Sequence, residues 1–161
     1  MRPVPEDPAR RDADAGALAA AFAADFLSWD ESDPARRARA LATYAAPGGD
    51  PATGWSGRGR QRADLALPGA VVRLGADRVL VHVRVRVTPF RRVAPSGPRP
   101  VRFALDVLPF PASAPAPAHP MWEGLDSYWY ELLVPMRGSV DRWRVDVGAV
   151  IAVPPLPERG S

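Results

Sequence analysis

The sequence predicts an α+β domain in which four to five antiparallel strands pack on two N-terminal helices. Two observations predict this class. Between about residues 14 and 44, apolar residues recur at spacings of three and four, the period of an amphipathic helix. From about residue 70 onwards, apolar and polar residues alternate, as in a strand that buries one face. A chain of 161 residues fits one domain, expected over residues 13–157.

The first helix is predicted at about residues 14–29. Asp12 or Asp14 is the expected N-cap. One apolar face is formed by side chains spaced three and four residues apart: Leu18, Phe22, Phe26 and Trp29. Asp25 lies on the flank of this face. Residues 1–12 are polar and rich in proline, so we expect a flexible lead-in there.

The second helix is predicted within residues 32–44. Ser32 or Asp33 is the expected N-cap, and Pro34 suits the first helical position because its missing N–H loses no hydrogen bond there. The side chains expected to face the core are those of Ala38, Leu41, Ala42 and Tyr44. The side chains expected to face water are those of Arg36, Arg37 and Arg39.

The clearest strand covers residues 79–87, because every second residue there is valine. The predicted inner face consists of Val79, Val81, Val83, Val85 and Val87. The predicted outer face consists of Leu80, His82, Arg84 and Arg86. A Gly-Ala-Asp turn at residues 75–77 precedes this strand, which predicts a hairpin with the β-rich run before it.

Three further strands are predicted at residues 101–107, 127–136 and 142–153. In the last of them, Trp143, Val145 and Val147 alternate with Arg142, Arg144 and Asp146. Between the first two, residues 108–120 contain many prolines, which exclude a central strand and predict a long loop. Residues 158–161 are expected to be a tail.

The glycine- and arginine-rich stretch at residues 54–62, Gly-Trp-Ser-Gly-Arg-Gly-Arg-Gln-Arg, leaves two functions open. It lacks the third glycine of a dinucleotide-binding loop and the Gly-Lys-Ser/Thr of a P-loop, so we expect no phosphate cradle. Arg58, Arg60 and Arg62 could contact nucleic acid, but Trp55 is the one aromatic residue of the stretch that could stack on a base. The favoured interpretation is a connector into the first strand, with Trp55 packed over an edge.

Few residues suggest catalysis or metal binding. The sequence has no cysteine and only two histidines, His82 and His119, which lie far apart and are expected to be solvated. The acids that could act as bases inside the fold are Asp25, Asp106 and Asp146. For the last two, pairing with arginines such as Arg84, Arg102, Arg142 or Arg144 is the favoured interpretation. We therefore expect no enzyme activity, no cofactor and no metal.

The positive charge is concentrated in the middle of the chain. All 21 basic residues are arginine, and residues 34–102 contain 14 of them with only three acids. The two ends of the chain are acidic. The basic segment could therefore be neutralised within the fold, or it could face an anionic partner.

Alternation places several arginines on the outer face of the predicted sheet, where Glu131 could join them. Arginine and tryptophan are enriched at the energetic hot spots of protein interfaces. An ordinary solvated sheet face is the alternative. The candidate interface, including two residues of the connector, consists of Trp55, Arg58, Arg84, Arg86, Arg102, Trp129, Arg142 and Arg144.

Over roughly residues 17–157, the sequence resembles the actinobacterial conjugal transfer proteins related to the conjugative transposon protein TcpC. The most specific parts are residues 26–34, Phe-Leu-Ser-Trp-Asp-Glu-Ser-Asp-Pro, and residues 54–61, Gly-Trp-Ser-Gly-Arg-Gly-Arg-Gln. The closing run Val-Asp-Val-Gly-Ala-Val-Ile-Ala-Val-Pro-Pro-Leu-Pro also contributes. These segments carry no catalytic motif, so the resemblance rests on their order and spacing.

The resemblance implies a nuclear-transport-factor-two-like cone, in which a curved antiparallel sheet wraps around helices. It also implies a non-enzymatic scaffold of a type IV secretion-like channel, located on the outer side of the cytoplasmic membrane, often trimeric, and bound to other channel subunits. The sequence has no run of 18 or more apolar residues and no secretory signal, so we expect no direct membrane insertion by this chain.

Three functions therefore remain to be weighed against a structure. The first is a scaffold in conjugative DNA transfer. The second is a small-molecule enzyme of the same fold, such as an isomerase, cyclase or dehydratase, which would require a buried, unpaired aspartate or histidine in the cone. The third, which the sequence favours least, is nucleic-acid binding through the basic segment.

Overall fold

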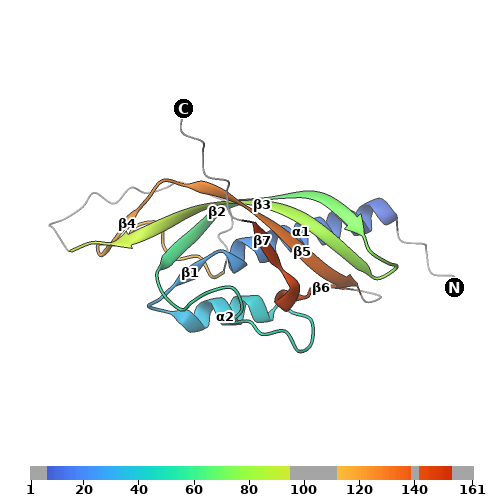
Figure 1. The fold of residues 1–161 in the computed structure, drawn as a ribbon, viewed down its shortest axis with the longest axis horizontal. Helices are drawn as coiled ribbons and strands as arrows, with labels where there is room; N and C mark the ends of the chain where they lie inside the picture. Colours follow the sequence, from blue (N-terminus) through green and yellow to red (C-terminus); the bar gives the residue numbers. More distant parts are fainter. Residues whose placement is uncertain (1–6, 95–111, 139–141, 154–161) are drawn as a thin grey trace.

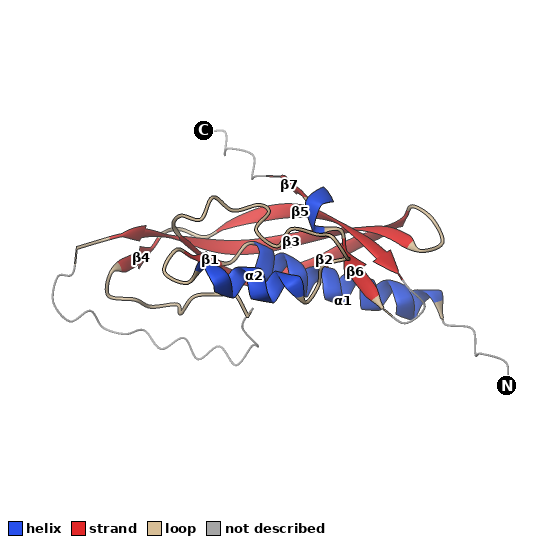
Figure 2. Ribbon diagram, turned by 90° about the horizontal axis from the view of Figure 1, so that it is seen from below, coloured by secondary structure: helices blue, strands red, loops and turns tan. Residues whose placement is uncertain are grey.

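Two helices lie against one side of a strongly curled antiparallel sheet (Figures 1 and 2). The computed structural model describes residues 7–94, 112–138 and 142–153. The predicted α+β class is confirmed. In chain order, the elements are α1 (Pro8–Phe26), β1 (Trp29–Asp30), α2 (Pro34–Ala42), β2 (Arg60–Arg73), β3 (Arg78–Arg92), β4 (Trp122–Gly124), β5 (Tyr128–Gly138), β6 (Trp143–Val145), the 3₁₀ helix η1 (Val147–Ala149) and β7 (Ile151–Val153).

Three long strands, β2, β3 and β5, form the body of the sheet. The strand order is β1-β2-β3-β5-β6, with β4 added beside β3 and β7 beside β5, and every pairing is antiparallel. The described residues thus contain seven strands rather than the four to five predicted, because four short strands extend the long ones. The β2–β3 register shifts twice, between Ala63 and Leu65 and between Pro68 and Val71. Such irregularities increase local twist and bending, which favours the observed curl.

The core lies between α1 and the concave face of the sheet. The predicted inner valines of β3, from Val79 to Val87, are all at most 1% exposed. They pack in one apolar cluster with Phe22 and Phe26 of α1 and Leu132 and Val134 of β5. Alanines at positions 15, 19 and 23 of α1 belong to the same cluster, and their small side chains let the helix lie close to the sheet.

Helix α1 begins within the stretch expected to be a lead-in. Asp7, rather than Asp12 or Asp14, is the N-cap, and its carboxylate accepts a hydrogen bond from the N–H of Ala9 at 3.0 Å. The helix ends at Phe26, so Trp29 belongs to β1 and pairs with Gln61. Its first turns carry few large apolar residues, and periodicity therefore placed the start too late.

Helix α2 begins at Pro34 as predicted, but its buried side differs from the prediction. Leu41 is buried, whereas Ala42 is exposed and Ala40 takes its place in the interior. Arg37, expected to face water, is only 2% exposed. Its guanidinium lies 4.9 Å from the centroid of the Phe26 ring, and its N–H groups donate to the carbonyl oxygens of three residues: Phe26, Pro51 and Thr53. Burial lowers the pKa of Arg37 to about 10.

The C-terminal part differs from the single strand predicted over residues 142–153. It forms β6, then the 3₁₀ turn η1, then β7, so that β6 and β7 pair with different parts of β5. The N–H of Asp146 donates to the carbonyl oxygen of Pro135 at 2.9 Å, where the chain leaves β6. The predicted strand at residues 101–107 and the predicted tail lie outside the described residues.

Replacing Arg37 by methionine should destabilise the fold by about 2–3 kcal/mol, because carbonyl oxygens at the end of α1 and in the loop after α2 would lose their donors. The measurement is urea unfolding followed by circular dichroism. The control is Arg39→Met on the same helix, where the side chain is 69% exposed and a change within about 0.5 kcal/mol is expected. Equal effects of the two substitutions would contradict the structural role of Arg37.

Candidate protein-interaction surface

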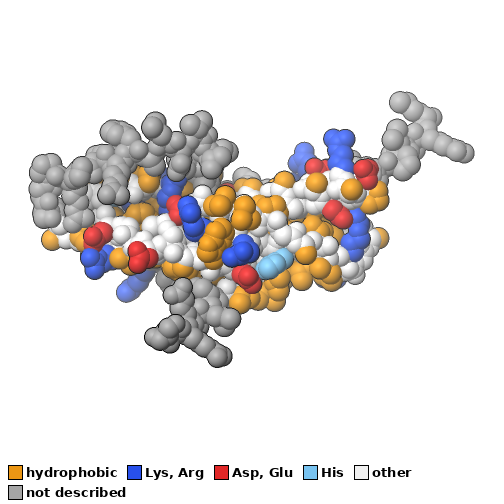
Figure 3. Space-filling view, turned by 90° about the horizontal axis from the view of Figure 1, so that it is seen from above, with side chains coloured by type: hydrophobic (Ala, Val, Ile, Leu, Met, Phe, Trp, Pro, Cys, Tyr) orange, Lys and Arg blue, Asp and Glu red, His pale blue; other side chains and the backbone are white. Residues whose placement is uncertain are grey.

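Within the described ranges, no helix covers the convex side of the sheet; this side is the candidate surface, and we call it the outer face (Figures 1 and 3). Its membership follows from the strand register, because residues opposite the outward positions of β3 also point outwards. The central part consists of His82, Arg84, Arg86, Trp129 and Glu131. Apolar residues on either side of this centre are Leu65, Leu67 and Val72 of β2 and Ile151 and Val153 of β7.

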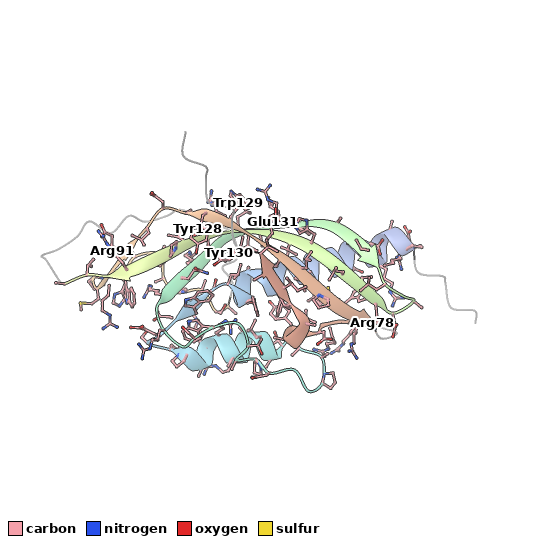
Figure 4. The ribbon with its side chains drawn as sticks, in the orientation of Figure 1. Arg78, Arg91, Tyr128, Trp129, Tyr130 and Glu131 are labelled. Carbon is pink, nitrogen blue, oxygen red and sulfur yellow. The ribbon has the colours of Figure 1, made fainter. Side chains whose placement is uncertain are left out.

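The centre of the outer face is organised around Arg84 and Trp129. The guanidinium carbon of Arg84 lies 4.9 Å from the centroid of the Trp129 ring, a cation–π arrangement. Arg84 faces Glu131 in the β3–β5 register, and Arg86 faces Trp129. Figure 4 shows Trp129 and Glu131 on the upper side of β5, with Tyr128 and Tyr130 on the side toward the helices. These contacts hold an arginine, an aromatic ring and a carboxylate side by side on a rigid strand pair.

His82 belongs to the same centre and has a partner that the sequence did not reveal. Its Nε2 lies 3.4 Å from a carboxylate oxygen of Glu131, and its side chain is 37% exposed. The prediction of a solvated strand histidine is therefore right about exposure but missed the carboxylate. The cause is diagonal pairing across two strands, which local alternation does not show.

Exposed apolar side chains flank this charged centre. The exposed fraction is 51% for Val72 on one flank and 55% for Ile151 on the other. In the space-filling view, apolar side chains spread over this side of the molecule around the histidine and the charged groups (Figure 3). A large apolar surface with an arginine–aromatic centre is typical of a protein-interaction site.

The structure brings only part of the predicted interface together. Arg84, Arg86 and Trp129 are neighbours. Arg144, in contrast, lies opposite Arg137, which is six residues further along β5 than Glu131, the residue opposite Arg84. At about 3.4 Å per residue, this separation is roughly 20 Å. Arg144 also donates to the carbonyl oxygen of Thr43 at 2.9 Å. Arg142 is exposed next to β6, at the same distant end. Arg102 lies outside the described residues.

Trp55 and Arg58 lie in the connector that leads into β2, as the sequence analysis placed them. Trp55 stacks on Trp29 of β1 with ring centroids 6.2 Å apart, and its Nε1 donates to the carbonyl oxygen of Arg58 at 2.8 Å. The N–H of Gly59 donates to the Glu31 carboxylate at 2.7 Å, which lowers the pKa of that carboxyl. Arg58 itself is exposed. The role of both residues at an interface remains a prediction.

Arg60 and Arg62 are not placed as the nucleic-acid hypothesis requires. They are only 4% and 6% exposed, because residues 112–118 lie over them; we call this segment the strap. Arg62 donates to the carbonyl oxygen of Pro115 at 2.7 Å, and Arg60 donates to that of Ala116 at 2.6 Å. Two of the three arginines of that stretch therefore bind protein carbonyl groups and are shielded from a phosphate backbone.

Asp25 is the one buried carboxylate within the described residues, and its oxygens are engaged. It is 2% exposed; it accepts a hydrogen bond from the hydroxyl of Tyr44 at 2.7 Å, and others from the N–H and the hydroxyl of Ser113 at 2.8 Å each. Burial, followed by the contact with Asp25, raises the pKa of Tyr44 well above its usual value. This arrangement fastens the strap to α1.

The remaining acid and histidine candidates from the sequence are Asp146, His119 and Asp106. Asp146 lies 3.3 Å from Arg137, so the predicted structural pairing holds, with a different arginine from those proposed. His119 is exposed, as expected, and its Nδ1 accepts a hydrogen bond from the N–H of Met121. Asp106 lies outside the described residues. Within the part of the chain that the structure describes, no group of three acids or histidines could hold a metal ion.

Comparison with solved structures identifies the architecture. A protein described as an NTF2-like protein involved in plasmid conjugation superposes with a TM-score of 0.62, at 19% sequence identity, over 91% of this chain and 50% of that one. The chain has an NTF2-like fold. This chain spans about half the length of the protein with which it superposes. No family model matches the sequence, and no curated protein sequence matches it.

The two faces of the NTF2-like cone differ in exposure. Within the described residues, the valines of β3 and the aromatic residues of α1 fill the concave face, whereas apolar residues of the convex outer face such as Val72 and Ile151 are exposed. None of the helices in the described ranges is both long and apolar enough to span a membrane.

Sequence reasoning missed the strap and its anchors. A weak signal was present, because Arg60 and Arg62 stand at the start of a strand while Ser113 stands among alanines and prolines. Nothing local to either segment links them, since 53 residues separate Arg62 from Pro115.

Gly54 should be intolerant of substitution, because its φ is +87° and a Cβ there would lie 2.4 Å from the ring of Phe26. We expect Gly54→Ala to destabilise the fold by at least about 2 kcal/mol, as judged by urea unfolding. Gly57→Ala is the matched control: it shares the positive φ but has open space around it, so it should cost only about 1 kcal/mol. If the two variants were equally stable, the close packing of the connector on Phe26 would be wrong.

Alkaline pH should weaken the tyrosine-bearing side of β5. Burial, and then the contact with Tyr130, raises the pKa of Tyr128 from 10.0 to about 12, so the folded state favours the neutral phenol. That stabilisation is complete below pH 10 and disappears as the pH rises to about 12. The free energy of unfolding should therefore fall across this window, and it should fall less in Tyr128→Phe. The check is chemical denaturation at several pH values, with tyrosinate absorbance measured in parallel.

Proposed function

We propose that this chain is a non-catalytic assembly domain of a conjugative DNA-transfer apparatus of the type IV secretion kind, related to the TcpC-like scaffold proteins. The observation that carries the proposal is the structural likeness to a protein involved in plasmid conjugation, which extends over 91% of this chain. The resemblance of the sequence to conjugal transfer proteins supports the same assignment independently. The partners we propose are other subunits of the transfer channel.

The outer face supports an assembly role. It combines the Arg84–Trp129 pair with two exposed apolar flanks, and this composition is typical of interface hot spots surrounded by apolar area. A fitting partner would present apolar side chains to Val72 and Ile151, and at least one carboxylate to Arg84 or Arg86. Since Glu131 already lies opposite Arg84, the partner's carboxylate would complete a charge network between the strands.

The interior supports a non-catalytic role. An enzyme of this fold would need a free base facing the concave side of the sheet. The inward positions of β3 are valines, and Asp25 is hydrogen-bonded to Tyr44 and Ser113. The small-molecule enzyme is therefore the less favoured function.

The proposal is tested in donor cells that express the chain with Arg84→Glu and Trp129→Ala together. Both changes lie on the outer face and should leave the core intact. We expect transfer frequency to fall at least about tenfold, because loss of a hot-spot pair weakens binding by more than that. Affinity purification of the chain from solubilised membranes should at the same time lose the co-purified channel subunits.

The control is Arg39→Glu, which places the same charge change on the exposed side of α2. It should leave transfer and co-purification unchanged. Cellular protein levels, measured by immunoblot, separate loss of function from loss of the protein. Normal transfer by the double variant at normal protein levels would refute the assignment of the outer face.

A further inference from the structure

The strap belongs to the connection between β3 and β4, whose two ends are paired with each other independently of the strap. Strand β4 pairs with the end of β3. At the base of this connection, the N–H of Val93 donates to the carbonyl oxygen of Met121 at 2.9 Å. The base is therefore held by sheet pairing, and the strap can be considered separately as a segment bound to the rest of the domain.

Side chains of α1, α2 and β2 bind the strap through its backbone. Arg36 donates to the carbonyl oxygen of Ala112 at 2.7 Å, and Asp25 accepts from the N–H of Ser113 at 2.8 Å. Arg62 and Arg60 donate to the next carbonyl groups along the strap, those of Pro115 and Ala116. Four protein side chains thus bind four backbone groups of one five-residue stretch, which is how a receptor binds an extended peptide.

The strap itself has the composition of such a peptide. Its sequence from residue 112 to 118 is Ala-Ser-Ala-Pro-Ala-Pro-Ala, and prolines favour an extended polyproline II conformation at low entropic cost. Ser113 and Ala114 are 2% and 4% exposed, so small side chains fit where larger ones would not. The Ser113 hydroxyl shares its one proton between the carboxylate and the carbonyl oxygen of Asp25, each 2.8 Å away.

Both arginines lie beneath the strap, and each also pairs with an acid of the domain: Arg60 with Asp30 at 3.1 Å and Arg62 with Asp64 at 3.5 Å. In β2, Gln61 and Ala63 point inward: Gln61 donates to the carbonyl oxygen of Leu27, and Ala63 belongs to the core. Arg60 and Arg62 alternate with them and therefore project to the opposite side, where Arg60 lies 5.3 Å from the Phe90 ring. Without the strap, these arginines, their paired acids and the aromatic ring would form a polar site in which the N–H groups that now bind the strap carbonyls are free for another peptide.

The fit of the strap leaves one donor unused. The Nε of Arg60 is the single buried side-chain polar atom in the described residues that has no hydrogen-bond partner. Buried polar atoms are nearly always satisfied, and burial also lowers the pKa of Arg60, chiefly by desolvation. The site thus has more donor capacity than the strap uses.

We propose that Asp25, Arg36, Arg60 and Arg62 form a binding site for an extended, proline-containing peptide of small residues, and that the strap occupies this site as an intramolecular ligand. The site is separate from the outer-face centre at Arg84 and Trp129, so it extends beyond the assembly function proposed above. A peptide from outside binds when the strap leaves, and the tethered strap competes with it at a high effective concentration.

The test uses the full chain with residues 112–118 replaced by a glycine-serine segment of equal length. The probe is a fluorescein-labelled peptide with the sequence of residues 111–119, and binding is followed by fluorescence anisotropy. We expect the strap-replaced chain to bind the peptide and the unmodified chain to bind it at least about tenfold more weakly. Adding Asp25→Asn or Arg62→Met to the strap-replaced chain should weaken binding about tenfold or more, because each removes a charge-assisted hydrogen bond.

Two controls test whether the binding of the peptide is specific. Adding Arg39→Met, an exposed arginine of the helix that carries Arg36, should not change peptide affinity. A peptide in which the serine is replaced by valine should bind more weakly than the original, because it cannot donate its hydroxyl to Asp25. Equal affinity of all peptides and variants would show non-specific adsorption and overturn the proposal.

A second variant provides the same test if the strap-replaced chain folds poorly. Ser113→Asp keeps the chain length but sets a carboxylate against that of Asp25, which should expel the strap by charge repulsion. Folding of both variants is checked by circular dichroism and urea unfolding. If either variant is folded and does not bind the peptide, the strap is only a structural segment and the proposed site does not exist.

Discussion

The packing of α1 on the valine row of β3 is the contact on which the rest of the structure depends. Val79 to Val87 are almost completely buried, and they meet a helix face built of alanines and phenylalanines. Because this interface fills the concave side of the curled sheet, it determines two things together. Among the described residues, it fills the cone with apolar side chains, and it leaves the convex side of the sheet for the interface that we propose. The proposed non-catalytic role and the proposed outer-face interface thus rest on the same packing arrangement.

The buried arginines bind irregular segments of the chain by donating hydrogen bonds to the backbone carbonyl groups of those segments. Arg37 holds the loop after α2 against the end of α1, and Arg60 and Arg62 hold the strap. A guanidinium suits this task because it presents several N–H donors in one plane on a long apolar stem. In an NTF2-like domain with long connections, these side chains supply the hydrogen bonds that strands would otherwise provide. The same donors that fasten the strap could bind a peptide from another molecule.

The two proposed sites, the outer face and the strap site, would use different modes of recognition on one domain. The outer face offers a broad apolar surface with Arg84 and Trp129 at its centre, suited to a folded partner. The strap site offers discrete donors and one carboxylate, suited to the backbone of an extended segment. If both operate, a folded subunit and an extended segment can be bound at the same time, since the residues that bind them do not overlap.

Local sequence patterns were sufficient to predict the α+β class, the inner row of β3, the start of α2 at Pro34 and the placement of Arg84 and Trp129 on one face of the sheet. Each of these depends on local periodicity, or on pairing of strands with strong alternation, and local patterns report which side of an element is buried. The burial of Arg37, Arg60 and Arg62, and the large distance between Arg144 and Arg84, became evident in the tertiary structure alone. Arg37 does lie on the buried helical period with Ala40 and Leu41, but its residue type argued for water. Arg60 and Arg62 contact the strap, which is more than 50 residues distant in the sequence, and no local pattern contains that information.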